Sequence, residues 1–153
     1  MLNFLVDKRF SRFFPISYGG VQIRVAEALT ILPLFFGEAV LGLTVGCLLA
    51  NFFGNGVLDI VFGTLATFLS SLITYVIGRK IKSVKLKFIL GALPPVLINA
   101  IIIPFTFLVI VELKELYFIS MLQIFIGQLI SIYIIGAFIY FPLQKLHDKK
   151  IKG

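Results

Sequence analysis

The chain has 153 residues, 59% of them hydrophobic, and its mean hydropathy is +1.08. Soluble domains contain about 45–50% apolar residues, so this composition excludes a soluble globular protein. The net charge of +7 does not indicate nucleic-acid binding, because the basic residues crowd one loop, 79–87, and the C-terminal end. Lys and Arg in short segments beside apolar runs mark the cytoplasmic side of a membrane protein.

Residues 1–17 contain no spanning segment. Phenylalanines are interleaved there with Asp7, Lys8, Arg9 and Arg12. Each of the three cations would cost about 2.5–3.5 kcal/mol near the centre of a bilayer. We therefore predict an atypical segment that lies at the membrane interface.

Residues 18–53 combine a polar, glycine-bearing loop with an apolar run that is interrupted once. As one helix, 25–53 would be about 43 Å long, against a hydrocarbon core of about 30 Å. Pro33, Gly37 and Glu38 interrupt the run, and a proline removes an internal helical hydrogen bond. We predict two short spans, 25–36 and 39–53, with the chain turning back at Gly37 and Glu38.

The alternative for this region is one long span, which gives four spans in all. With 79–87 and the C-terminal end inside, the hairpin places nine basic residues inside and five outside, whereas the single span places thirteen inside and one outside. The charge count favours the single span, and the helix length favours the hairpin. The hairpin puts Gln22 and Arg24 outside and Glu38 inside, where Glu38 fits docking or solvation.

Three further apolar runs, 57–78, 88–111 and 116–141, are each long enough to cross a membrane. In the second run, Pro94 and Pro95 should kink the helix. The first run carries hydroxyl side chains on one face, which we expect to bond within the helix or to a neighbouring helix: Thr64, Thr67, Ser71 and Thr74.

A stripe of small residues lies in the second half of the hairpin. Gly42, Gly46 and Ala50 recur at four-residue spacing, which lets a neighbouring helix approach closely. We expect this stripe to serve packing.

These features predict an all-α fold, a polytopic membrane helical bundle of five spans if the hairpin forms. We expect a single integral membrane domain over 1–153. It comprises the N-terminal segment 1–17, the helical bundle 18–142 and a basic cytoplasmic tail 143–153.

Two strings make the sequence similar to a known family. QIRVAEALTILP, starting at Gln22, and LPPVLIN, ending at Asn99, resemble the QueT family, as does most of residues 15–142. QueT proteins are substrate-binding (S) components of energy-coupling-factor (ECF) transporters. The pattern of Leu32 and Pro33 followed by Gly42 and Gly46 also recurs in other S components.

The resemblance implies a six-helix S component with its substrate site near the outer face. It therefore predicts a bundle of five to six spans whose first helix is truncated or atypical in this chain. It also implies docking on a membrane T component that is driven by two cytoplasmic ATPases, in the plasma membrane of a prokaryote. The implied substrate is queuine or a related 7-deazaguanine, and relatives that carry cobalamin leave that vitamin as an alternative. The family's first helix should precede residue 15, and residues 1–14 are too short and too charged to form it. Either the start codon is placed too late, or this chain has lost or rebuilt that helix; we expect upstream DNA to encode about 20 apolar residues in frame.

A 7-deazaguanine presents amide-like donors and acceptors on a flat ring, and its site needs amide or carboxylate groups beside apolar walls. Polar residues in spans or at the outer lip are therefore candidates for substrate binding. The candidates are Gln22, Arg24, Glu27, Asn51, Asp59, Asn99 and Gln128, with Tyr133 as a weaker one.

Each candidate also has a purely structural interpretation. Arg24 and Glu27 are three residues apart and can pair on a helix. Asn51 and Asp59 can cap helix ends around the turn at 53–58. Asn99 can satisfy the carbonyl groups that the two prolines leave unpaired.

The sequence does not predict an enzyme, a cofactor or a metal site. It contains no GxxxxGK[ST] loop, no HExxH and no paired Cys/His set, so energy for transport has to come from a partner or an ion gradient. Two functions compete with substrate capture: a self-sufficient small-molecule transporter or channel, and a structural or assembly factor that binds no small molecule.

Overall fold

The computed structural model describes residues 25–54, 57–105 and 114–152. The predictions for residues 1–17, Gln22 and Arg24 lie outside these residues. The described chain is helical, which confirms the all-α class. Its elements are η1 (Val25–Leu34), α3 (Glu38–Gly54), α4 (Val57–Lys80), α5 (Val84–Ile102), α7 (Lys114–Leu129), η2 (Ile130–Ile135) and α8 (Gly136–Lys152).

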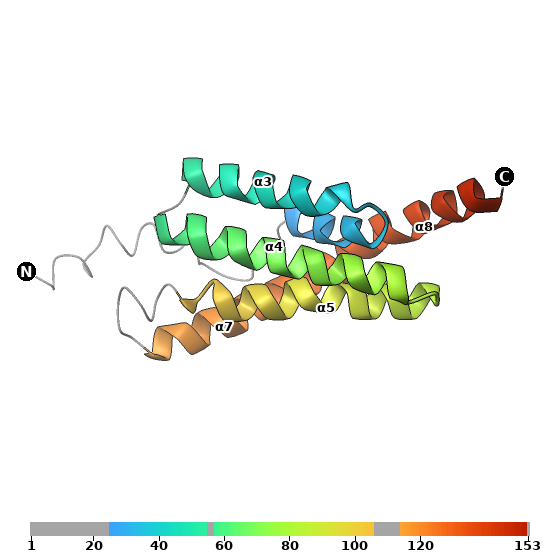
Figure 1. Cartoon of the computed structure of the whole chain (residues 1–153). Helices are drawn as coiled ribbons and strands as arrows, with labels where there is room; N and C mark the ends of the chain where they lie inside the picture. Colours follow the sequence, from blue (N-terminus) through green and yellow to red (C-terminus); the bar gives the residue numbers. More distant parts are fainter. Residues whose placement is uncertain (1–24, 55–56, 106–113, 153) are drawn as a thin grey trace, which may run out of the picture.

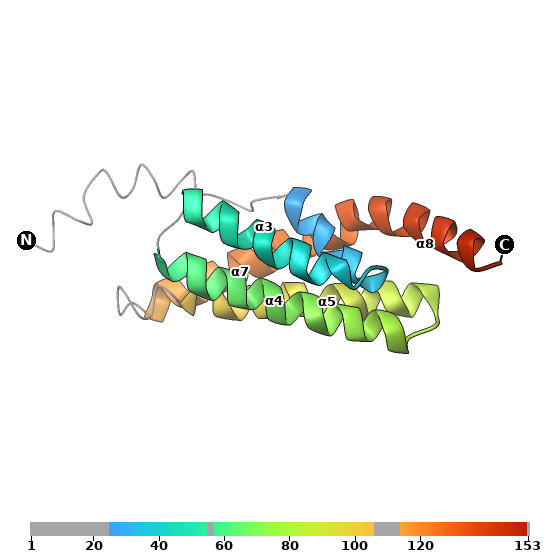
Figure 2. The same ribbon diagram turned by 45° about the horizontal axis from the view of Figure 1, so that its top comes forward.

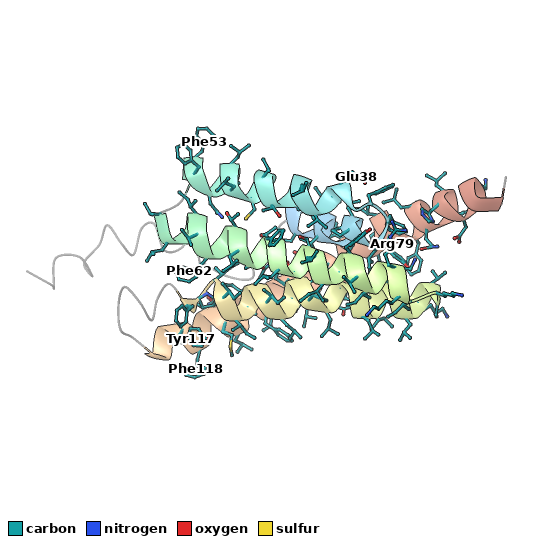
Figure 3. All side chains as sticks on the ribbon, in the orientation of Figure 1. Glu38, Phe53, Phe62, Arg79, Tyr117 and Phe118 are labelled. Carbon is teal, nitrogen blue, oxygen red and sulfur yellow. The ribbon has the colours of Figure 1, made fainter. Side chains whose placement is uncertain are left out.

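The helices run along one another as an elongated bundle (Figure 1, Figure 2). Within the part of the chain that the structure describes, three helical stretches are long and apolar enough to cross a membrane: Ile60–Lys80, Val84–Ile102 and Tyr117–Lys149. We call the end that carries Arg79, the start of α5 and the end of α8 the basic end, and the opposite end the distal end. Figure 3 shows Glu38 and Arg79 toward the basic end, and Phe53, Phe62 and Tyr117 toward the distal end.

The reversal predicted at Gly37 and Glu38 is confirmed, although η1 ends at Leu34, two residues before the predicted end of the first arm, and α3 starts at Glu38. The backbone N–H groups of Phe35 and Phe36 both donate to the Leu32 carbonyl oxygen, at 3.0 and 3.1 Å, and close a tight turn at the basic end. The turn fits against α4 because Gly78 has no side chain: a Cβ there would lie 2.6 Å from the Leu34 carbonyl oxygen. Glu38 is exposed at this end, as the hairpin requires.

The first arm of the hairpin, η1, is a 3-10 helix of ten residues. At a rise of about 2.0 Å per residue it is about 20 Å long, shorter than a bilayer core. Figures 1 and 2 show it beside the half of the bundle nearer the basic end. The described part of η1 therefore fills the interior of the basic half only.

Two predicted boundaries differ from the structure because cationic residues continue the helices. Arg79 and Lys80 end α4, and α5 already starts at Val84, so only 81–83 separate the two helices instead of the predicted 79–87. At the C-terminus, α8 runs to Lys152 where we predicted a tail from 143. Lys and Arg are good helix formers, and their long side chains reach polar surroundings from a helix end.

The core gathers in the basic half. The buried residues Ile31 and Leu34 of η1 pack there with Phe88 and Ala92 of α5 and with Tyr140 of α8. The Tyr140 hydroxyl donates to the Val84 carbonyl oxygen at 2.8 Å and ties α8 to the start of α5. This cluster holds η1 in the centre of the bundle.

The expectation for the small-residue stripe is wrong within the described residues. Gly42 and Gly46 are exposed, and a Cβ at either position would meet no atom within 4 Å. Instead, α3 contacts α4 through Asn51. Its amide nitrogen packs so closely on Gly63 that a Cβ added to Gly63 would lie 2.7 Å from it. The stripe therefore lies on the face of α3 that points away from the bundle.

Candidate functional site

Asn99 lies on the buried stripe of α5. Buried positions recur along this helix at Phe88, Ala92, Pro95 and Asn99, which gives one continuous face toward the interior. Asn99 is 3% exposed, and its Oδ1 atom has no hydrogen-bond partner among the described residues. Because a buried unpaired carbonyl oxygen costs about 1–3 kcal/mol, this atom requires a donor.

Asn99 does not bond to the backbone carbonyl oxygen that Pro95 leaves unpaired, contrary to the structural interpretation of this residue. Pro95 cannot donate to the Gly91 carbonyl oxygen, four residues earlier. The Thr74 hydroxyl of α4 donates to that oxygen instead, at 2.9 Å. The Asn99 side chain is therefore not used to repair this part of α5.

Gln128 is the second buried amide with an unpaired atom. It is 5% exposed near the end of α7, and its Oε1 has no partner among the described residues. The π-helical turn η2 follows directly and packs its buried Ser131 and Ile132 in the bundle. Such π turns are frequent beside functional sites.

Thr64 is a residue that the sequence analysis did not select. Its Oγ1 is buried and, in the described part of the chain, unpaired. The other hydroxyls of the same face behave as predicted: Thr67 donates to the Gly63 carbonyl at 2.9 Å, and Ser71 to the Phe68 carbonyl at 3.0 Å. The sequence gives no signal that separates Thr64 from them, because all four hydroxyls have the same helical spacing.

The contacts between helices place these three groups at two depths. The helices α4 and α5 are antiparallel, and Thr74 of α4 bonds to Gly91 of α5. Counting from this contact, Thr64 lies within one helical turn of the level of Asn99 along the bundle axis. Tyr133 and Tyr117 of the last helix bond to the carbonyls of Ile89 and Ile101. This register sets Gln128 opposite Ala92, about two turns or roughly 10 Å from Asn99 toward the basic end.

The two depths differ in their relation to η1. Asn99 lies about one turn beyond the core residue Val96 toward the distal end, whereas Gln128 lies level with Ala92, which packs in the core with Ile31 and Leu34 of η1. We call Thr64, Asn99 and Gln128 the distal site.

The remaining candidates lie on different helices. Glu27 is half-buried in the first turn of η1, where the Thr30 hydroxyl donates to its carbonyl oxygen at 2.6 Å. Asn51 donates to Cys47 Sγ at 3.3 Å and packs on α4. Asp59 belongs to the first turn of α4 at the distal end. Tyr133 uses its hydroxyl between helices, at 2.7 Å from the Ile89 carbonyl oxygen.

The chemistry of the distal site is neutral hydrogen bonding between apolar walls. Two carboxamides and a hydroxyl can each donate and accept, so they suit a neutral heterocycle with mixed donors and acceptors. Among the described residues, no group of three or more His, Cys, Asp or Glu side chains could hold a metal ion.

The chain is similar to known transporters. The family model described as QueT transporter matches residues 9–145. The curated "Queuosine precursor transporter QueT" of Lactococcus lactis subsp. cremoris (strain MG1363) is 36% identical over 52 residues, which are 34% of this chain and 31% of that relative. The match thus spans about a third of the relative's length. No solved structure matches the chain.

Proposed function

The chain belongs to the QueT transporter family, and on this premise we propose that it is the substrate-capture membrane subunit of an ATP-driven importer. The substrates proposed are queuosine precursors, namely queuine or related 7-deazaguanines. The observation that carries the proposal is the distal site, where Asn99 and Gln128 hold unpaired amide oxygens inside a bundle of apolar helices. Polar groups buried without partners in a membrane protein are functional candidates by default.

The charge distribution supports an orientation with the distal site facing outward. Arg79 and Lys80 end α4, Lys82 lies between α4 and α5, and Lys145 and Lys149 lie on α8. Positive residues beside spans mark the cytoplasmic side. We propose a multi-pass protein of five to six spans in a prokaryotic plasma membrane, with the distal end outside.

The proposed energy source is a set of partner proteins. The sequence has no phosphate-binding GxxxxGK[ST] loop of its own. The S-component role that accompanies the family supplies the partners: a membrane T component and two cytoplasmic ATPases. Capture by this chain and release driven by the partners then form one import cycle.

Two measurements test this function. First, purified protein should bind queuine in equilibrium titration, whereas a chain with both Asn99→Leu and Gln128→Met should not. Second, uptake of labelled queuine into proteoliposomes should require the T component and both ATPases together with ATP. Uptake by this chain alone would show a self-sufficient transporter, and absence of queuine binding by the wild type would overturn the substrate.

A further inference from the structure

We propose that the outer side of the contact between α5 and α8, at the basic end, binds an anionic phospholipid. Two exposed lysines flank this contact, and exposed apolar side chains continue from them along the helices. We call these residues the α5–α8 surface: Lys85 and Ile89 of α5, with Phe138, Phe141 and Lys145 of α8. The ligand that fits is a lipid of the adjoining leaflet with a net negative headgroup, such as phosphatidylglycerol.

The contact between α5 and α8 is fixed by one hydrogen bond and by aromatic packing. The Tyr140 hydroxyl donates to the Val84 carbonyl oxygen at 2.8 Å. The Phe88 ring packs against Tyr133 and Phe141, and in both pairs the ring centroids are 5.7 Å apart. Because Phe141 is 49% exposed, its ring lies at the outer edge of this contact.

The two lysines lie on the sides of their helices that point away from η1. Phe35, next to the end of η1, marks the inner side: its ring centroid lies 6.0 Å from Lys87 Nζ and 5.2 Å from the Tyr140 ring. Since a helix turns about 100° per residue, Lys85 lies about 160° around α5 from Lys87. In the same way, Lys145 lies about 140° around α8 from Tyr140. Both lysines are exposed and therefore belong to the outer side of the contact.

The apolar residues of the α5–α8 surface face lipid chains. Ile89 and Phe138 are 48% and 79% exposed. They belong to helical stretches that are long and apolar enough to span a membrane. Exposed apolar side chains on spanning helices contact acyl chains, which are equally apolar. The headgroup of a lipid bound along this surface then lies at the basic end, beside the lysines.

The two lysines are close enough in depth to share one phosphate. Val84 and Tyr140 lie at one level because they are bonded to each other. Lys85 is one residue from this level and Lys145 is five residues from it in the opposite direction, which separates them by about 9 Å along the axis. Lysine side chains are long and flexible, so both can reach a phosphate between them. Figures 1 and 2 show α8 continuing past the start of α5, as this position of Lys145 requires.

Charge complementarity selects an anionic headgroup. Among the described residues, neither Lys85 nor Lys145 has an ion-pair partner. The carboxylate of Asp148, three residues after Lys145, accepts a hydrogen bond from the Gln144 amide at 2.7 Å. By contrast, Lys87 is half-buried and makes a cation–π contact inside the bundle. A zwitterionic lipid would leave the positive charge of the two exposed lysines uncompensated.

Lipid-dependent stabilisation of the purified protein tests this site. The melting temperature of delipidated protein in a neutral detergent is followed by ellipticity and titrated with phosphatidylglycerol or with zwitterionic phosphatidylcholine. We expect phosphatidylglycerol alone to raise it. A variant with both Lys85→Gln and Lys145→Gln should need about tenfold more phosphatidylglycerol for half of the effect, because each lysine beside an anionic headgroup contributes to the attraction.

Matched variants separate this site from general attraction between charges. Lys80→Gln with Lys114→Gln removes the same charge from the end of α4 and the start of α7, and should leave the lipid requirement unchanged. Lys85→Arg with Lys145→Arg keeps both charges and should behave as the wild type. Without lipid, all of these variants should melt as the wild type does, since the substituted side chains make no described contact.

The apolar half of the surface has its own test. Phe138→Ala should weaken the effect of phosphatidylglycerol without changing the melting temperature of lipid-free protein, because this side chain is 79% exposed. Inorganic phosphate at matched ionic strength should not stabilise the protein. Equal stabilisation by phosphatidylcholine or by inorganic phosphate would overturn the lipid site. So would an equal loss in the two double glutamine variants, or no stabilisation of the wild type.

Discussion

The Thr74 hydroxyl donates to the Gly91 carbonyl oxygen at 2.9 Å, and this is the oxygen that Pro95 leaves without its helical partner. One hydroxyl on α4 thus compensates for a proline on α5. The consequence reaches the site, because Asn99, one turn beyond Pro95, keeps its side-chain oxygen available.

Replacing Thr74 with valine should destabilise the protein. The change keeps the shape and leaves the fully buried Gly91 region with an unpaired carbonyl. We expect a loss of about 1 kcal/mol, in the range measured for hydrogen bonds between membrane helices. Thermal unfolding in detergent measures it. Thr74→Ser retains the donor and deletes only one buried methyl group, so its loss should be the smaller of the two. An equal loss in both variants would contradict the role of the bond.

Substitutions at two glycines should have opposite effects. Gly78→Ala places a Cβ 2.6 Å from the Leu34 carbonyl oxygen and forces the hairpin turn away from α4. We expect a loss of about 1–3 kcal/mol in the free energy of unfolding. Gly46→Ala is the matched control, since no atom lies within 4 Å, and the better helix propensity of alanine should maintain or raise stability. Equal destabilisation by both changes would show that the stripe on α3 is packed.

Two tyrosines of the last long helix allow a buried side chain to be compared with a half-buried one. Tyr140 is fully buried and bonds to Val84 at 2.8 Å, whereas the half-buried Tyr117 lies 3.4 Å from the Ile101 carbonyl oxygen. Tyr140→Phe should lower stability by about 1 kcal/mol, and Tyr117→Phe should change it little. Chemical unfolding followed by ellipticity compares them. The reverse order would mean that α8 is not anchored through Tyr140.

Thiol labelling can determine the orientation of the protein in the membrane. Glu38 and Phe53 are exposed at the two ends of α3, and Cys47 is the chain's single cysteine, so Cys47→Ala gives a clean background. An impermeant maleimide should label Glu38→Cys only from the cytoplasmic side and Phe53→Cys only from outside. The opposite pattern would place the distal site in the cytoplasm and contradict the capture role.

The sequence predicted features that depend on helix length and on strong breakers. Pro33, Gly37 and Glu38 located the reversal before Glu38 because together they remove a hydrogen bond, loosen the chain and add a charge. Asn99 and Gln128 were selected because polar residues inside apolar runs are rare. Both proved to be buried with an unpaired oxygen, whereas their role in binding stays a prediction.

The sequence analysis did not predict features that depend on tertiary packing. The 3-10 geometry of η1 and the π turn of η2 reflect how these segments fit in the bundle, and apolar periodicity does not distinguish them from an α-helix. Thr64 was missed because only the register of α4 against α5 separates it from Thr67. The stripe of Gly42 and Gly46 was assigned to packing because spacing does not tell which face meets a neighbour.

We propose that a deazaguanine binds among Thr64, Asn99 and Gln128 inside the bundle. Photo-crosslinking can locate the bound base, with a 7-deazaguanine that carries a diazirine on its arm and with mass spectrometry of the labelled peptides. We predict labels on α5 near Asn99 and on α7 near Gln128, abolished by excess queuine. Labels confined to the outward face of α3 or to the basic end, or labels that queuine does not displace, would contradict it.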